Sequence, residues 1–196
     1  MIAIIDYDMG NLRSLENALG RLGAQCVVTA DPEIICKAER VILPGVGHAG
    51  KAMENLEARN LPGLIRSLRQ PVLGICVGMQ VLCRDSEEAP GKPCIGIFDA
   101  HVKCFPPAPG RKVPHMGWND LSNMEGKLLK GVAPHSFVYF VHSYYAGLCP
   151  DTVATCNYDG VLFSAALRYE NFYGTQFHPE KSGGIGEQIL ENFLSI

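Results

Sequence analysis

Short, unbroken apolar runs recur along the first half of the chain, and segments with helical periodicity separate them. Each run has the length and composition of a buried strand. Strands that alternate with helices pair in parallel, so the pattern predicts an α/β fold with an open, mostly parallel (mixed) central sheet and helices on both faces. The strands predicted in this half are residues 1–5, 26–28, 40–43 and a run at 71–73.

The helices are predicted from apolar spacing together with start and stop signals. Asn11 is a suitable N-cap for the first helix, and Gly23 is a suitable terminator. Further helices are predicted at about residues 49–59 and 61–69, and a final one at 185–194 with Ile189 and Phe193 on its inner face. The apolar face of the first helix consists of Leu12, Leu15, Leu19 and Leu22.

Beyond residue 93 the pattern changes to strands, which predicts that the second half adds mixed or antiparallel strands to the sheet. The proline-rich segment 105–111 is interpreted as a surface loop and not as a domain linker. One domain over residues 1–196 is therefore expected. The strands predicted here are residues 95–98, 137–141, 153–155, 162–165 and 172–177.

Composition narrows the class of protein. A hydrophobic fraction of 47% and a net charge of -3 give no electrostatic reason to expect nucleic acid or an anionic membrane as partner. No apolar run approaches the about 20 residues of a membrane span, and residues 1–5 lack a basic leader. The eight cysteines form no Cys-x-x-Cys pair, so neither zinc nor disulfides are expected. We therefore predict a cytoplasmic protein without metal or cofactor.

Residues 74–78 read Gly-Ile-Cys-Val-Gly and join a predicted strand to a predicted helix at 77–83. Glycines on both sides of a nucleophile allow the sharp turn that exposes it at the end of a sheet. At the first turn of the helix, Cys76 would also feel the positive end of the helix dipole, which favours the thiolate. A motif this short describes a buried structural cysteine equally well.

A second candidate group follows the predicted strand 172–177, where His178 precedes Glu180 by two residues. Side chains two apart in an extended segment point to the same side, so the carboxylate can orient the imidazole toward a nucleophile. Together with Cys76 this predicts a Cys-His-Glu triad of thiolate, proton shuttle and orienting carboxylate. An isolated histidine would be interpreted as structural, and the pairing with Glu180 favours catalysis.

The loop at residues 44–47 (Pro-Gly-Val-Gly) follows a predicted strand and so lies at the same edge of the sheet as Cys76. Its backbone N–H groups are candidates for an oxyanion hole, which stabilises the negative charge of a tetrahedral intermediate. A plain strand-to-helix turn has the same sequence, and the spacing alone does not decide between the two. The candidate residues are Gly45, Val46, Gly47 and Val77.

These motifs resemble those of the class I (triad) glutamine amidotransferases, in which such a Cys, His and Glu hydrolyse the side-chain amide of glutamine. The resemblance covers essentially all 196 residues. The Pro-His-Met-Gly-Trp-Asn segment and the Lys after His-Pro-Glu are typical of the branch that serves histidine biosynthesis. Asp8 stands where the family commonly has Gly, which puts only the shape of the first turn in doubt. The matching segments are residues 6–14, 44–47, 74–80, 113–119 and 177–182.

The resemblance also implies substrate contacts. Gln80 lies one helical turn after the nucleophile and shares its face. In the family, the corresponding Gln and a Glu matching Glu88 contact the bound glutamine, and the Glu suits its α-ammonium group. Without the family, Glu88 would be interpreted as part of a solvated acidic run. Ser143 and Tyr144 resemble the family's wall for the amino-acid moiety, whereas His142 is expected to be structural.

A partner is expected because this chain leaves no domain to bind an ammonia acceptor, and ammonia released into the cytosol would be protonated. The resemblance implies a (βα)₈-barrel cyclase that forms a heterodimer with the glutaminase. This cyclase makes imidazole glycerol phosphate and aminoimidazole carboxamide ribonucleotide. The residues predicted at the interface are Asn11, Trp118 and Lys181.

Three alternatives remain open at this stage. A glutaminase subunit for anthranilate, aminodeoxychorismate or pyridoxal phosphate synthesis would share the triad, but Trp118 and its flanking motif argue against it. A free-standing thiol hydrolase, such as a peptidase or a γ-glutamyl hydrolase, would need no partner. A non-catalytic interaction subunit is the third class, and the complete triad argues against it.

Overall fold

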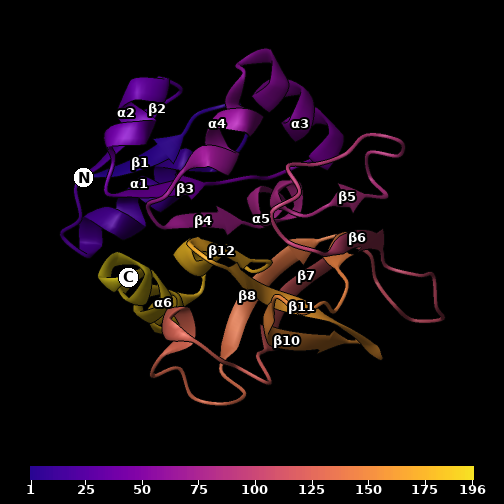
Figure 1. The fold of residues 1–196 in the computed structure, drawn as a ribbon. Helices are drawn as coiled ribbons and strands as arrows, with labels where there is room; N and C mark the ends of the chain where they lie inside the picture. The colour runs from indigo at the N-terminus through magenta and orange to yellow at the C-terminus, as the bar shows by residue number, and fades with distance from the viewer.

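A computed structural model, which describes residues 1–196, has a seven-stranded sheet in the order β10-β11-β12-β4-β3-β1-β2 (Figure 1). The strands from β12 to β2 are parallel, and β11 and β10 extend the sheet with antiparallel pairing. The predicted mostly parallel sheet is therefore confirmed. The strands are β1 (Ile2–Ile5), β2 (Cys26–Thr29), β3 (Arg40–Leu43), β4 (Val72–Ile75), β10 (Thr152–Tyr158), β11 (Val161–Tyr169) and β12 (Phe172–Thr175).

Helices flank this sheet, and strands β1, β4 and β12 are buried at every position because both of their faces are covered. The first helix begins as predicted: the Asn11 side chain accepts a hydrogen bond from the N–H of Ser14 at 3.4 Å. No helix is both long and apolar enough to cross a membrane. The helices are α1 (Leu12–Arg21), α2 (Pro32–Lys37), α3 (Ala49–Ala58), α4 (Leu61–Ser67), α5 (Val77–Leu82) and α6 (Gly183–Ser195).

The chain between β4 and β10 adds two small β-structures beside the large sheet, drawn in colours from magenta to orange in Figure 1. One is a three-stranded sheet of β5 (Asp85–Ser86), β6 (His101–Cys104) and β9 (Tyr144–Ala146). The other is an antiparallel pair of β7 (His115–Asp120) and β8 (Phe137–His142). The N–H of His178 donates to the carbonyl of Tyr139 at 3.0 Å, which ties β8 to the segment after β12.

The predicted strand at residues 95–98 is wrong. All four of its N–H groups donate at 2.8–3.0 Å to carbonyls at the end of α5, which the helix itself leaves without partners. Gly96 has φ of +73°, which breaks an extended conformation. The apolar pattern instead reflects burial of Ile95 and Phe98. The accepting carbonyls belong to Val81, Leu82 and Cys83.

Two further sequence interpretations need adjustment. Helix α2 was not predicted, although Asp31 caps it and Pro32 opens it. The loop 105–111 is exposed over residues 106–110, whereas Arg111 is half-buried and Phe105 is buried against His142 and Phe163. Asp8 has φ of +61°, a backbone conformation that glycine adopts at lower cost. Its carboxylate forms an ion pair with Arg59, with 2.5 Å between Oδ2 and Nη2.

Candidate active site

Cys76 occupies a strained turn between β4 and α5. Its φ of +54° and ψ of -112° are unusual for a residue with a side chain. Its N–H donates to the carbonyl of Thr175 at 2.7 Å, and its carbonyl accepts from the N–H of Gln80 at 3.1 Å. The neighbouring strand and the following helix thus hold this conformation in place, and the turn has the form that residues 74–78 predict.

His178 and Glu180 are paired at the end of β12. Nδ1 of His178 donates to Oε1 of Glu180 at 2.8 Å, and both side chains are buried. The geometric reason differs from the expected one, because the segment is not extended beyond His178. Residues Pro179–Lys181 form a 3₁₀ helix, and this turn folds the carboxylate back onto the imidazole.

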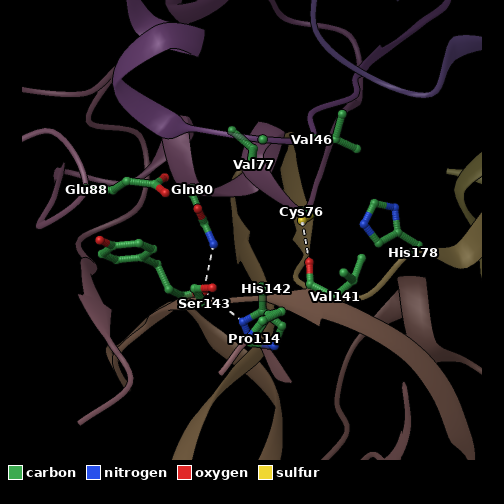
Figure 2. A pocket seen from close by; sticks show the side chains of 12 residues that line it. Val46, Cys76, Val77, Gln80, Glu88, Pro114, Val141, His142, Ser143 and His178 are labelled. Carbon is green, nitrogen blue, oxygen red and sulfur yellow. Dashed lines mark hydrogen bonds between the residues drawn. The ribbon is translucent and has the colours of Figure 1, made fainter. Parts of the chain in front are cut away.

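The other ring nitrogen of His178, Nε2, faces the sulfur of Cys76 (Figure 2). Nε2 makes no hydrogen bond in this arrangement, and the thiol is directed at the carbonyl of Val141, 3.9 Å away. Burial alone would lower the pKa of His178, but the neighbouring Cys76 and Glu180 outweigh it and raise the pKa to about 9. The imidazole beside the Cys76 thiol therefore stays protonated to a higher pH than a free imidazole does.

A cavity of about 250 Å³ opens beside Cys76 and His178 (Figure 2). It brings together nearly every side chain that the sequence indicates for catalysis or substrate binding. Gly45 and Glu180 are the exceptions, because they line a smaller adjoining cavity together with Asn11. The cavity is lined by Val46, Gly47, Cys76, Val77, Gln80, Glu88, Pro114, Val141, His142, Ser143, Tyr144 and His178.

The loop after β3 packs directly on the start of α5. A Cβ atom at Gly45 would lie 2.4 Å from the backbone nitrogen of Gly78, so only glycine allows this approach. The hydroxyl of buried Tyr7 donates a hydrogen bond to the carbonyl of Pro44 and so holds the first residue of the loop in place. The N–H groups of Val46, Gly47 and Val77 donate to no other backbone group, so they are available as donors beside Cys76.

Gln80 and Glu88 are both anchored by backbone groups. Gln80 is buried, and its Nε2 donates to the carbonyl of Tyr144 at 2.9 Å. Oε2 of Glu88 accepts from the N–H of Ala49 at 2.6 Å, at the N-terminus of α3. A carboxylate is favourable at that end of a helix. The interpretation of Glu88 as a solvated acidic side chain is thus wrong, because it is partly buried and lines the cavity.

The predicted interface residues do not behave alike. Trp118 on β7 is 55% exposed and lies in an apolar patch with Met116 (67%) and Phe137 (56%), two residues that sequence reasoning missed. Nζ of Lys181 lies 5.9 Å from the centre of the Tyr139 ring. The Tyr139 ring in turn packs edge-on against Trp118. Asn11, in contrast, uses its side chain to cap α1.

Sequence reasoning also missed Gln176, which is fully buried next to Cys76. Its Nε2 donates to Sγ of Cys76 at 3.7 Å. A signal for it was present, since it lies two residues before His178 at the end of a predicted strand and so faces the same side. His142, which was expected to be structural, is buried, its Nδ1 donates to the carbonyl of Tyr144 at 2.8 Å, and it also lines the cavity.

Comparison with known proteins relates this geometry to a family. Residues 3–196 match the family model "Glutamine amidotransferase class-I". The chain is 52% identical over 196 residues to the imidazole glycerol phosphate synthase subunit HisH of Bacteroides thetaiotaomicron, covering 100% of this chain and 99% of that protein. It is 47% identical over 198 residues to the protein of the same name in Methanothermobacter thermautotrophicus, covering 100% and 98%.

Solved structures of lower identity share the fold. The crystal structure of a glutamine amidotransferase superposes with a TM-score of 0.75 at 20% identity, covering 100% of this chain and 98% of that one. PurLQS from Thermotoga maritima superposes with a TM-score of 0.71 at 18% identity, covering 99% and 97%. At such identities the likeness supports the arrangement of strands and helices and nothing more specific.

Proposed function

This chain belongs to the class I glutamine amidotransferase family, and we propose that within it the chain is the glutaminase subunit of imidazole glycerol phosphate synthase. It hydrolyses glutamine to glutamate and ammonia for histidine biosynthesis. Full-length identity of 44–52% to subunits of that synthase supports this assignment. The observation that carries the chemistry is the buried His178–Glu180 pair facing a strained cysteine across a cavity.

In the proposed mechanism, the Cys76 thiolate attacks the side-chain amide carbon of glutamine. His178, as imidazolium, gives its proton to the departing ammonia, which leaves a γ-glutamyl thioester. The neutral imidazole then takes a proton from water as this water attacks the thioester, which releases glutamate and regenerates the Cys76 thiolate. Glu180 holds Nδ1 at 2.8 Å throughout, so Nε2 keeps facing the sulfur.

The cavity supplies the groups that this reaction needs. The N–H groups of Val46, Gly47 and Val77 would stabilise the oxyanion, and each such donor is worth about 3–4 kcal/mol in comparable enzymes. The carboxylate of Glu88 suits the α-ammonium group of glutamine, and its anchoring at α3 holds it at the cavity wall. The remaining contacts to the substrate are assigned to Gln80, Ser143 and Tyr144.

We assign the partner to the apolar patch on β7 and β8. Exposed Trp118 and Met116 provide the kind of aromatic and methionine surface that is enriched at interface cores. The proposed occupant is a (βα)₈-barrel cyclase that forms a heterodimer with this chain and consumes its ammonia, with Asn11 and Lys181 also at the interface. A cytoplasmic location suits the eight cysteines, none of which is paired in a disulfide.

The first prediction tests the triad. Cys76→Ala should abolish glutamine hydrolysis, while its complex with the cyclase should still make product from added ammonium salt, because only ammonia production is lost. His178→Ala should be nearly as inactive, and Glu180→Ala less impaired, since the carboxylate orients and does not react. Glutamate release and imidazole glycerol phosphate formation are measured separately.

Cys36→Ala is the control for this experiment, because Cys36 is an exposed free cysteine on α2. It should retain both activities. Retention of glutamine hydrolysis by Cys76→Ala would show that the triad assignment is wrong.

A further inference from the structure

We propose that Gln176 is a further catalytic residue, whose side-chain amide donates a hydrogen bond to the Cys76 sulfur and stabilises its thiolate. The inference rests on the proposed function, in which that sulfur is the nucleophile. Gln176 follows β12 directly, is fully buried, and places Nε2 3.7 Å from Sγ. An N–H donor at that position favours the charged form of the thiol over the neutral one.

The orientation of the Gln176 amide follows from its neighbours. The carbonyl oxygen of Tyr144 can only accept, so the group of Gln80 that meets it at 2.9 Å must be the NH₂ group. The same nitrogen of Gln80 lies 3.0 Å from the amide of Gln176, which must therefore present its oxygen there. With its oxygen committed to Gln80, Gln176 has its NH₂ group toward the sulfur.

A pair of buried histidines fixes the Tyr144 carbonyl from a second side. Nδ1 of His142 donates to this carbonyl at 2.8 Å, and Nε2 of His142 lies 3.0 Å from Nδ1 of His115. Burial lowers the pKa of His142 to about 3 and that of His115 to about 4, so both rings are neutral near pH 7. Nε2 of His142 then accepts from Nδ1 of His115, and the Tyr144 carbonyl accepts from both His142 and Gln80.

Two consequences follow for the cavity. The nucleophile meets an N–H group instead of an amide oxygen, which would repel a thiolate. Gln80 uses both of its N–H bonds on Tyr144 and Gln176, so its Oε1 is left as the acceptor that it can offer to a bound substrate. Gln176 therefore acts on the resting enzyme, before glutamine binds, and its effect is measurable on the thiol itself.

The experiment measures alkylation of Cys76 by iodoacetamide as a function of pH, with the Cys76 peptide quantified by mass spectrometry. Gln176→Met removes the hydrogen-bond donor at similar side-chain volume. The pH midpoint of alkylation should rise by about one unit, so the alkylation rate at pH 7 should fall by about tenfold. Gln176→Glu, which keeps the shape but places a carboxylate there, should raise the midpoint further. The kcat for glutamine hydrolysis with the partner should fall in the same order.

Gln188→Met is the matched control, because it makes the same substitution at an exposed glutamine of α6 whose amide donates to Asn192 and does not line the cavity. It should leave the profile unchanged, and exposed Cys36 is the internal reference in every sample. Wild-type midpoints in either folded Gln176 variant would overturn the proposal. Such a result would leave the triad untouched, whereas hydrolysis by Cys76→Ala would refute the proposed function itself.

Discussion

At the residue scale, backbone strain and chemistry coincide at Cys76. A residue with a side chain at φ of +54° costs about 1–3 kcal/mol, and the cost is tolerated only where the surroundings enforce the conformation. Here the enforcement comes from the hydrogen bonds to Thr175 and Gln80. This turn places the sulfur at the cavity wall, beside His178 and 3.7 Å from Nε2 of Gln176.

The raised pKa of His178 predicts the alkaline limit of the reaction. Burial lowers this pKa, but Cys76 and Glu180 raise it to about 9, so the imidazolium that would protonate ammonia in the proposed mechanism persists to about that pH. We expect kcat/KM for glutamine to fall above about pH 9, and Glu180→Gln should move this fall to lower pH. The same shift stabilises the fold below about pH 6.5, and this contribution is lost as pH rises through about 9.

The measurement is a pH–rate profile of glutamate release by the complex. His135→Gln is the control, because His135 is an exposed histidine that does not line the cavity. An alkaline limb that stays in place in Glu180→Gln would contradict the role of that carboxylate.

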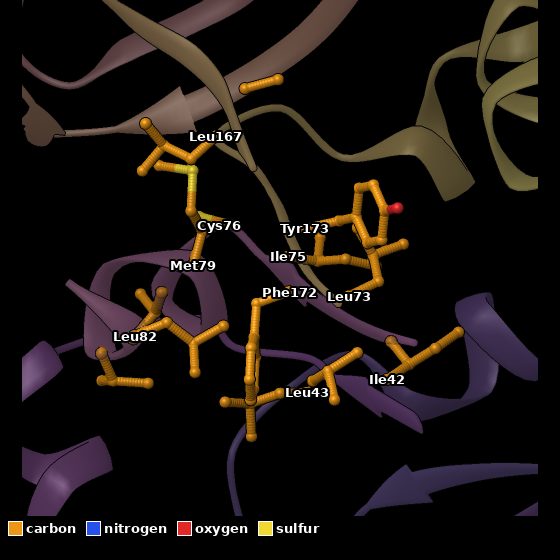
Figure 3. Close-up of a cluster of buried hydrophobic side chains, with 14 of the residues drawn as sticks. Ile42, Leu43, Leu73, Ile75, Cys76, Met79, Leu82, Leu167, Phe172 and Tyr173 are labelled. Carbon is orange, nitrogen blue, oxygen red and sulfur yellow. The ribbon is translucent and has the colours of Figure 1, made fainter. Parts of the chain in front are cut away.

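At the scale of elements, the site depends on the close packing of α5 against the end of β3. Leu82 of α5 and Leu43 of β3 belong to one cluster of buried side chains that also includes Phe172 of β12 (Figure 3). Glycine at position 78 allows this contact, because a Cβ there would lie 1.9 Å from the carbonyl oxygen of Leu43. Backbone thus meets backbone, and no side chain can move aside to make room.

Gly78→Ala should therefore destabilise the protein and disturb the loop at residues 44–47, which contains the proposed oxyanion donors. We expect a loss of about 3 kcal/mol in the free energy of unfolding, typical of strong overpacking, together with a lower kcat. Urea denaturation monitored by circular dichroism measures the first, and glutamate release the second. Gly20→Ala on α1 is the control: a Cβ there meets nothing within 4 Å, so it should be neutral or stabilising by up to about 1 kcal/mol.

At the scale of the whole molecule, the apolar patch and the cavity lie on connected elements. Trp118 pairs with Tyr139 across β7 and β8, and the carbonyl of Tyr139 accepts the N–H of His178. A partner that docks on Trp118 therefore contacts strands that border the triad. This arrangement gives the proposed partner a physical route to the site.

The patch predicts where partner affinity is concentrated. Trp118→Ala should weaken binding of the cyclase by about 2 kcal/mol or more, roughly 30-fold in Kd, because buried Trp anchors dominate interfaces. Isothermal titration calorimetry measures this. Tyr169→Ala is the control, since Tyr169 is 47% exposed but pairs with Phe172 at the opposite end of β12 from the site. Equal losses in both variants would exclude a specific role for Trp118.

The Pro-Gly-Val-Gly loop predicts that turnover depends on the partner. Glycines flank Val46, so its N–H can turn toward or away from Cys76 at little cost. One missing oxyanion donor slows the reaction by about 10²–10³, and a liganded partner would shift the loop toward the competent form. We expect very slow hydrolysis by the chain alone and a large rise in kcat, more than in KM, with the liganded cyclase.

Steady-state glutamate release decides this in three states: the chain alone, with the cyclase, and with the cyclase and its ligand. Comparable kcat values in all three states would contradict control of turnover by the partner and favour a free-standing hydrolase.

The sequence by itself determined the parts that depend on local chemistry. Apolar periodicity predicted α1 and the parallel strands of the sheet, because a buried face imposes its spacing on the chain. The glycines around Cys76 predicted a strained turn that the structure contains, since few residues permit one. The strand ends also predicted which candidate groups would meet at one edge, and the cavity lining includes nearly all of them.

Only the tertiary structure decided what depends on contacts between distant segments. Residues 95–98 have the composition of a strand, yet their N–H groups donate to the free carbonyls at the end of α5. The local sequence of residues 95–98 gives no sign of these distant acceptors. Glu88 is indistinguishable from a solvated carboxylate until α3 supplies an N–H partner. The amide of Gln176 is oriented toward Cys76 by Gln80, whose own amide is oriented by the Tyr144 carbonyl. Such partners lie far apart along the chain, and folding alone brings them together.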